Sequence, residues 1–362
     1  MAGASGVPAG LSEVTPQWVG DVLGMRVDDV EVEPIGAAAG FIGQLARVHV
    51  TSDGGGGVLD DGPTSVIVKL PSADAAALEI AAAYRFYERE GGFYRHLATG
   101  PAGCGVPVPR CYATIGDDND VALVLEDLHD LRVGDQVAGA SMTDARRALR
   151  TAADLHSAWW EHPDLPAMDW LPKGSDPVYK IAAVNYPLAW PFFVQGYGDL
   201  LTPEQLRVGE GLIDSIDRFV AEAGDPPLTI NHGDFRLDNL FFSANDDAPC
   251  TVIDWQIASR SRTGCFDVAY FLSGNLDPSE LEISFEPLLR TYHDRLVERG
   301  VEGFSFADLE HEMRRAALGC LAYPVLGATV LGQDDPRAVA LFTRMIRGYF
   351  GLAVTLDAGS VL

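Results

Sequence analysis

Residues 230–242 carry the most informative pattern in the chain and read Ile230-Asn231-His232-Gly233-Asp234-Phe235-Arg236-Leu237-Asp238-Asn239-Leu240-Phe241-Phe242. A short apolar run, 251–253, follows them and ends in Asp254-Trp255. Phosphoryl transfer from a nucleotide needs a carboxylate that orients the acceptor hydroxyl and takes its proton. It also needs an amide oxygen and a second carboxylate that hold Mg²⁺ against the phosphates. Asp234 fits the first role, and Asn239 and Asp254 fit the second.

The apolar runs 240–242 and 251–253 predict a hairpin whose turn is the polar segment 243–249. Such a hairpin returns Asp254 to the neighbourhood of Asn239. The alternative is that these polar side chains only cap turns. We favour the metal site because both halves of the pattern occur together in a sensible strand context.

His-Gly-Asp-Phe-Arg-x-x-Asn followed by Ile-Asp-Trp resembles the catalytic loop and metal carboxylate of the aminoglycoside phosphotransferase and choline kinase-like family, which is related to the protein kinases. The resemblance implies that Asp234 is the catalytic base and that Asn239 and Asp254 bind the metal. Arg236 stands where kinases keep a cation near the transferring phosphate, although it could be a plain surface arginine. His232 would be a structural residue of the loop, since the aspartate already supplies the base.

A lysine is rare in this chain, which has only Lys69, Lys173 and Lys180. Lys69 lies in the apolar strand predicted at 64–70, where a kinase keeps the lysine that grips the α- and β-phosphates. The alternative is an edge-strand lysine that extends to water. A helix predicted at 75–97, capped by Ser72, would supply the glutamate that pairs with this lysine.

Glu90 matches the spacing of the family best, so the resemblance favours it as that glutamate, with Glu88 and Glu79 as rivals. Gly91-Gly92 would weaken the helix by about 1 kcal/mol per glycine relative to alanine.

Further strands are predicted at 27–35, 44–51, 107–115 and 121–125, after a helix that begins at Thr15-Pro16 and ends at Gly24. The glycine-bearing turn 36–43, with Gly40 and Phe41, corresponds to the loop that kinases fold over the phosphates, or to an ordinary hairpin. Glu126-Asp127-Leu128 resembles the hinge of the family, where Glu126 and Leu128 would bind adenine through their backbone. Backbone contacts do not distinguish ATP from GTP.

The remaining chain reads as mostly helical, with a helix at 143–160 in which His156 is a core residue. Residues 164–201 read as irregular and aromatic, either core or an insertion at the acceptor site. A helix is predicted from Thr202 to Gly224. Asp267 suits the N-cap of the next helix, and the resemblance implies that it braces the catalytic loop. Three more helices are predicted to start at Asp277-Pro278, Ser305 and Asp335-Pro336.

The 362 residues are enough for two lobes, and the 47% hydrophobic content is typical of a globular protein. A formal charge of −26 argues against nucleic acid or an anionic membrane surface as a partner. The sequence has neither an apolar run of membrane-spanning length nor a recognisable secretory signal. Five scattered cysteines form no C-x-x-C pair and favour reduced thiols in the cytoplasm.

We therefore predict an α+β, two-lobed protein kinase-like fold, with an antiparallel-sheet, nucleotide-binding N-lobe at 1–125 and a helical C-lobe at 126–362 that carries the catalytic loop and the acceptor site. The predicted reaction is transfer of the γ-phosphate of ATP, with GTP not excluded, to a hydroxyl of a small molecule, with Mg²⁺ as cofactor. The alternatives are a catalytically silent nucleotide-binding module and a protein kinase. Segments 93–94 and 270–272 resemble the ecdysteroid kinase-like branch, but the acceptor and the oligomeric state stay open.

Overall fold

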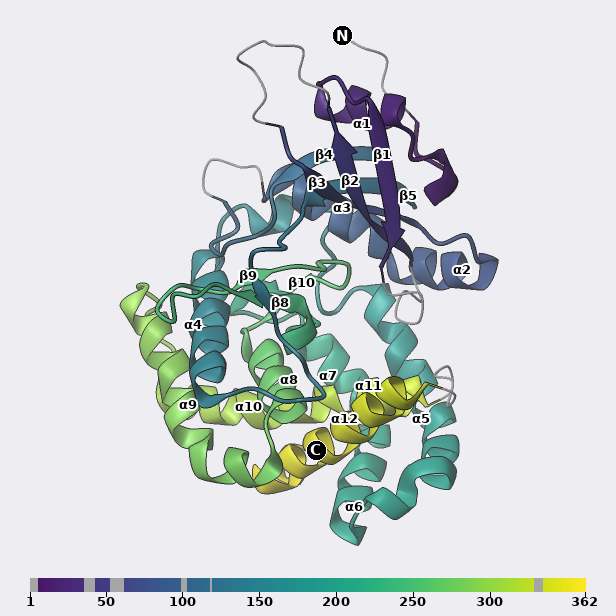
Figure 1. Cartoon of the computed structure of the whole chain (residues 1–362). Helices are drawn as coiled ribbons and strands as arrows, with labels where there is room; N and C mark the ends of the chain where they lie inside the picture. The colour runs from purple at the N-terminus through teal and green to yellow at the C-terminus, as the bar shows by residue number, and fades with distance from the viewer. Residues whose placement is uncertain (1–5, 36–42, 53–61, 99–102, 118, 329–334) are drawn as a thin grey trace. The chain divides into compact units, whose positions relative to one another are not determined.

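The computed structural model describes residues 6–35, 43–52, 62–98, 103–117, 119–328 and 335–362 (Figure 1). The chain divides into two compact units. Unit 1 contains residues 1–103, 108–130 and 255–257, and unit 2 contains residues 104–107, 131–254 and 258–362. An antiparallel sheet dominates the first and helices dominate the second, so the predicted α+β fold class is confirmed. The predicted roles of the two lobes, nucleotide binding in the N-lobe and the catalytic loop and acceptor site in the C-lobe, stay a prediction.

Unit 1 is built on a five-stranded sheet in the order β1-β2-β3-β5-β4, and every pairing in it is antiparallel. This is the sheet that the sequence predicts, although β4 begins four residues later than expected. The strands are β1 (Asp29–Pro34), β2 (Gly43–Thr51), β3 (Ser65–Pro71), β4 (Cys111–Asp117) and β5 (Asp120–Glu126).

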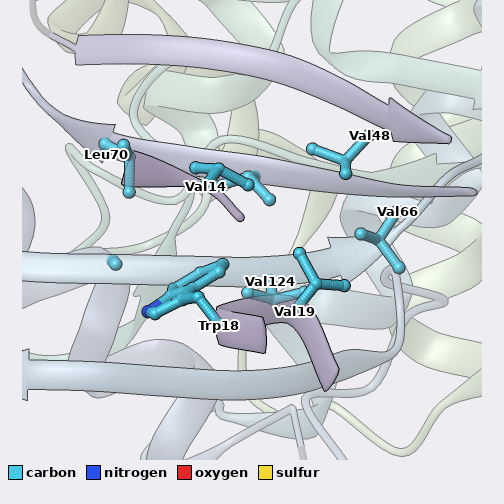
Figure 2. Packing of buried hydrophobic residues seen from close by; sticks show 9 residues of the cluster. Val14, Trp18, Val19, Val48, Val66, Leu70 and Val124 are labelled. Atoms are coloured by element: carbon cyan, nitrogen blue, oxygen red, sulfur yellow. The ribbon is translucent and has the colours of Figure 1, made fainter. Parts of the chain in front are cut away.

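The two faces of this sheet have different partners because side chains alternate along each strand. Val66, Val68 and Leu70 of β3 point to one face and pack against the predicted N-terminal helix, α1 (Pro16–Leu23), through Trp18 and Val19 (Figure 2). Thr15 caps this helix and Gly24 ends it in the left-handed conformation, as predicted. Since Lys69 lies between Val68 and Leu70, its side chain points to the opposite face.

The prediction of a single helix at 75–97 is wrong, because the structure has two helices there. Helix α2 (Ala75–Tyr84) ends at Arg85, which has φ 58°, and α3 (Phe86–His96) follows. Asp74, rather than Ser72, caps α2. The glycine pair stays inside α3, where a Cβ on Gly91 would lie 3.0 Å from Val121 of β5. The absence of a side chain there lets α3 approach the sheet closely.

Unit 2 has two small sheets, β7–β10 and β6-β8-β9, and the predicted hairpin is its β8–β9 pair. The strands are β6 (Arg132–Val133), β7 (Leu228–Asn231), β8 (Leu240–Phe242), β9 (Thr251–Val252) and β10 (Ser259–Arg262). The helices are α4 (Met142–Ala158), α5 (Pro177–Tyr197), α6 (Pro203–Gly211), α7 (Ile216–Glu222), α8 (Cys265–Asn275), α9 (Pro278–Glu298), α10 (Phe306–Cys320), α11 (Ala322–Gly327) and α12 (Pro336–Thr355).

Several helix predictions for unit 2 are confirmed and three are wrong. Asp277, Ser305 and Asp335 cap α9, α10 and α12 as predicted. Residues 164–201 are not irregular throughout, because 21 of them form α5. The helix predicted from Thr202 to Gly224 is α6 and α7 with a 3₁₀ turn between them. The N-cap of α8 is Gly264, so Asp267 does not cap it.

Within the described ranges, none of the helices combines the length and the apolar character needed to cross a membrane. All five cysteines are free thiols, and four of them are buried.

Candidate active site

The catalytic-type loop leaves β7 at Asn231 and turns sharply at Gly233, which has φ 85°. Asp267, fully buried in the first turn of α8, accepts hydrogen bonds from the backbone N–H groups of His232 (2.6 Å) and Gly233 (2.8 Å). His156 of α4 contacts the same carboxylate at 3.2 Å. Asp267 therefore braces the loop, as the resemblance implied, and His156 is a buried core residue as predicted.

The His232 ring is held in one orientation by two backbone groups. Its Nδ1 accepts a hydrogen bond from the N–H of Asp234 (3.2 Å), and its Nε2 lies 2.9 Å from the carbonyl of Ile253. Because a carbonyl can only accept, Nε2 carries the hydrogen and the ring is in the Nε2–H form. His232 thus joins the loop to the residue before Asp254, which supports its predicted structural role.

Asp234 is the carboxylate around which the other polar groups of the loop converge. Its Oδ1 accepts a hydrogen bond from the hydroxyl of Tyr270 (2.8 Å). Its Oδ2 accepts hydrogen bonds from Arg236 Nε (3.0 Å) and from the amide nitrogen of Asn239 (2.9 Å). The side chain is 15% exposed, so it is largely but not completely shielded from solvent.

Charge keeps this carboxyl ionised despite its burial. Burial by itself raises the pKa of Asp234, but the charge of Arg236, the nearby His232 and the hydrogen bond from Tyr270 together hold it below the ordinary value. In turn, the carboxylate raises the pKa of Arg236. Arg236 also donates to Gln136 (3.2 Å) and Asp238 (3.1 Å), so it is a partly buried, fixed cation rather than a plain surface arginine.

Asn239 and Asp254 carry oxygen donors, the type of ligand that a hard cation prefers. Among the described residues, the Asn239 side chain makes two hydrogen bonds, to the carbonyl and to Oδ2 of Asp234, and both use its amide nitrogen, which leaves its amide oxygen for another partner. The backbone N–H of Ile253 donates to the carbonyl of Asn239 (3.1 Å), which places Asp254 directly beyond this contact. Asp254 has φ 68°, a strained backbone of the kind found at functional sites. Two protein oxygens suit Mg²⁺, which completes its shell with phosphates and water.

Besides Tyr270, three polar residues of this network were missed from the sequence. Asp238 accepts from the backbone N–H of Gln136 (2.8 Å) and from Arg236, and Asn275 Oδ1 accepts from the N–H of Leu237 (3.0 Å). Gln136 and Asn275 are fully buried. They stand about 100 and 38 residues away from their partners, so a local pattern gives no sign of these contacts.

In unit 1, the structure joins the predicted lysine to the predicted glutamate. Lys69 Nζ lies 2.7 Å from Glu90 Oε2, and the two side chains are 20% and 4% exposed. Leu70, Tyr87, Val121 and Leu123 line the same small pocket. The rivals have other surroundings, because Glu88 pairs with Arg85 and Glu79 is exposed on α2.

The hinge-like tripeptide is anchored by its middle residue. Asp127 accepts hydrogen bonds from Arg47 (2.8 and 3.2 Å) and from Ser65 (2.7 Å), which ties it to β2 and β3. Glu126 accepts from the N–H of Arg110 at 3.0 Å, and Leu128 is half-buried. The predicted phosphate loop with Gly40 and Phe41 lies outside the described residues.

A family model of the Phosphotransferase enzyme family matches residues 43–299, which are more than two thirds of the chain. The chain belongs to this family. It is a phosphotransferase, as the sequence predicted, and the match spans both units and every described site residue named above. None of the curated proteins compared with the phosphotransferase matches it.

Solved structures with the same fold share little sequence with this phosphotransferase. An ethanolamine kinase from Plasmodium vivax is 10% identical with a TM-score of 0.52, over 88% of this chain and 80% of that chain. APH(2")-IIia in complex with GDP and kanamycin is 12% identical with a TM-score of 0.50, over 92% and 95% of the two chains. At these identities the likeness shows the fold alone, and the ecdysteroid kinase-like branch stays a prediction.

Proposed function

We propose that this phosphotransferase is a small-molecule kinase that moves the γ-phosphate of ATP, or of GTP, to a hydroxyl group, with Asp234 as the base. The observation that carries the proposal is the state of Asp234 and Asn239. Hydrogen bonds from Arg236 and Asn239 hold the Asp234 carboxylate and its pKa is lowered, while the asparagine gives its nitrogen to that carboxylate and would offer its oxygen to a cation. This division of roles is the one that phosphoryl transfer requires.

In the proposed reaction, Asp234 accepts the proton of the acceptor hydroxyl as its oxygen bonds to the γ-phosphorus. The bond from that phosphorus to the bridging oxygen breaks, and the nucleoside diphosphate leaves with the electron pair. Arg236 lies beside Asp234 and offers a cation to the transferred phosphate. Lys69, oriented by Glu90, would bind the α- and β-phosphates. Asn239 and Asp254 would hold Mg²⁺, which neutralises phosphate charge when it is bound.

The acceptor is proposed to be a small molecule. Similar structures include an ethanolamine kinase and a phosphotransferase in complex with GDP and kanamycin, and ethanolamine and kanamycin are both small hydroxyl-bearing molecules. Only residues 255–264 separate Asp254 from α8, which leaves little chain for the segment that a protein kinase uses to bind a peptide. A cytoplasmic location, where nucleotide and reduced thiols coexist, fits the five free cysteines and is part of the proposal.

The substitution Asp234→Asn tests the base. It keeps the shape of the side chain and removes its charge, so we expect kcat to fall by about 10²–10⁴-fold. Nucleotide affinity should change little, because the proposed phosphate and metal contacts belong to other residues. The measurements are steady-state kinetics on an acceptor found by screening hydroxyl compounds and isothermal titration with a non-hydrolysable ATP analogue. Near-normal turnover of the variant would remove Asp234 as the base, and a wild type that binds nucleotide but phosphorylates nothing would favour the silent module.

A further inference from the structure

The hydroxyl of Tyr270 contacts the proposed base from outside the catalytic loop. Tyr270 lies on α8, is 2% exposed and donates to Oδ1 of Asp234 at 2.8 Å. Within the part of the chain that the structure describes, it supplies the only hydrogen bond to this carboxylate from outside residues 232–239. Burial and the charge of Asp234 raise the pKa of this phenol well above its ordinary value. It therefore stays protonated and can serve as a donor throughout the physiological pH range.

The other two donors to Asp234 have a second task in the proposed function. Arg236 would serve the transferred phosphate, and Asn239 would bind the metal through its oxygen. Both bind Oδ2, so Oδ1 depends on Tyr270. A carboxylate oxygen has two lone pairs, so Oδ1 can accept from Tyr270 and from an acceptor hydroxyl at the same time.

Aromatic packing fixes the position of the Tyr270 ring. Its centroid lies 5.0 Å from that of Tyr323, 5.3 Å from that of Tyr349 and 5.8 Å from that of Phe266. In addition, the hydroxyl of Tyr323 donates a hydrogen bond to the carbonyl of Gly233 (3.0 Å). Helix α11 therefore holds the backbone of the catalytic-type loop, while α8 holds the carboxylate of Asp234. A side chain this constrained can orient a catalytic group with little loss of entropy.

We propose that Tyr270 is a positioning residue of the phosphotransferase, which holds the Asp234 carboxylate in the rotamer that receives the acceptor proton. This proposal rests on the proposed function of Asp234. It predicts that the hydroxyl of Tyr270 matters for the chemical step and has little effect on the binding of either substrate.

The test compares Tyr270→Phe with Tyr186→Phe. Tyr186 of α5 is fully buried and its hydroxyl donates a hydrogen bond to the carbonyl of Gly209 (3.0 Å) rather than to the base, so the second substitution controls for the loss of a buried phenol hydroxyl. With saturating ATP and the acceptor that the wild type phosphorylates, we expect Tyr270→Phe to lower kcat by roughly 10–100-fold with little change in the acceptor KM. Tyr186→Phe should stay within about threefold of the wild type. Equal losses of kcat in the two variants, or a loss confined to KM, would overturn the proposal.

A double-mutant cycle and a crystal structure complete the test. If Tyr270 acts through Asp234, Tyr270→Phe should have almost no further effect in the Asp234→Asn background, whereas independent roles would give multiplied losses that overturn the proposal. Crystals of Tyr270→Phe should show the Asp234 carboxylate rotated from its wild-type position, and an unmoved carboxylate would count against it. This structural readout does not depend on turnover. A wild type that phosphorylates no acceptor contradicts the proposed function alone.

Discussion

Lys69 and Glu90 form an ion pair on the face of the unit 1 sheet that α1 does not cover. The glutamate is almost fully buried, so the pair fixes the direction of the ammonium group. We expect Lys69→Ala to weaken productive use of ATP strongly, with kcat/KM for ATP lower by about 10²-fold or more. Lys180→Ala on α5 is the matched control, because Lys180 is exposed and has no proposed role. Unchanged ATP kinetics in Lys69→Ala would contradict the assignment.

As the proposed metal ligands, Asn239 and Asp254 would bind through oxygen atoms, which determines the kind of metal that we expect to support activity. We expect EDTA to abolish turnover, Mg²⁺ or Mn²⁺ to restore it, and Zn²⁺ to fail, because zinc favours nitrogen and sulfur ligands. Activity of the wild type at each metal is the measurement. Turnover that survives complete chelation would show that the two residues have another role.

The role of a single residue could be predicted when its interaction partner lies close to it in the sequence. Asp234 and Asn239 share one short motif, and Lys69 and Glu90 stand at the spacing that the family resemblance implied. The hydrogen bond between Tyr270 and Asp234 and the ion pair between Arg47 and Asp127 join residues 36 and 80 positions apart. Only tertiary packing brings these pairs together, so the pattern in the sequence gave no indication of them.

Helices α4 and α9 run side by side in unit 2 and share one buried carboxylate (Figure 1). Asp154 of α4 accepts hydrogen bonds from Arg295 (2.6 and 3.2 Å) on α9 and from Arg299 (2.7 Å) just beyond it, and its side chain is 8% exposed. Burial raises the pKa of Asp154, but the hydrogen bonds and charges of Arg299 and Arg295 outweigh this effect and lower it.

A lowered pKa means that the pair stabilises the fold above the unfolded-state value of about 4 and loses this contribution as the pH falls through the folded-state pKa. Asp154→Asn should lower the free energy of unfolding by about 1–2 kcal/mol at pH 7, since Arg299 is half-exposed. The difference from the wild type should shrink below about pH 4. Denaturant titrations at pH 7 and pH 3.5 measure it, with the exposed Asp294→Asn on α9 as control. A difference independent of pH would contradict the linkage.

At the level of elements, the sequence predicted the structure well where the start and stop signals are local. Thr15 and Gly24 bound α1, and Ser305 caps α10, because a cap needs only the backbone of its own helix. Helix α5 was missed because it contains Pro187 and Pro191, which break most helices. Packing against α11 and α7 overrides that preference. The break at Arg85 was missed because neither a glycine nor a proline marks it.

For the whole molecule, Trp255 shows that the two units are not separate segments of the sequence. Residues 255–257 belong to unit 1 although the chain on both sides of them belongs to unit 2. The fully buried Trp255 ring stacks on Phe93 of α3, with centroids 3.8 Å apart and planes at 7°. The sequence identified Asp254-Trp255 as part of a catalytic motif, but it gave no reason to assign the tryptophan to the first unit.

Trp255→Ala should therefore destabilise unit 1, although this residue lies more than 120 positions after the rest of unit 1 in the sequence. Loss of a large buried aromatic side chain typically costs about 3–5 kcal/mol, and Trp255→Phe should cost less because it keeps the stack. Hydrogen exchange should accelerate in α3 and in the strands of unit 1 in the alanine variant. The amides of α9 and α10 in unit 2 should exchange as in the wild type. Faster exchange confined to unit 2 would contradict this assignment.

The return of residues 255–257 to unit 1 also limits how such genes can recombine. In a chimera with a single crossover near residue 130, most of unit 1 would come from one parent, and the buried Trp255 would come from the other. A functional chimera would then need the tryptophan of one parent to fit against helix α3 of the other. The metal-binding candidate and the tryptophan are also adjacent in the chain, so they are inherited together. If Asp254 binds the metal as proposed, selection on that site in unit 2 is linked to selection on the packing of unit 1.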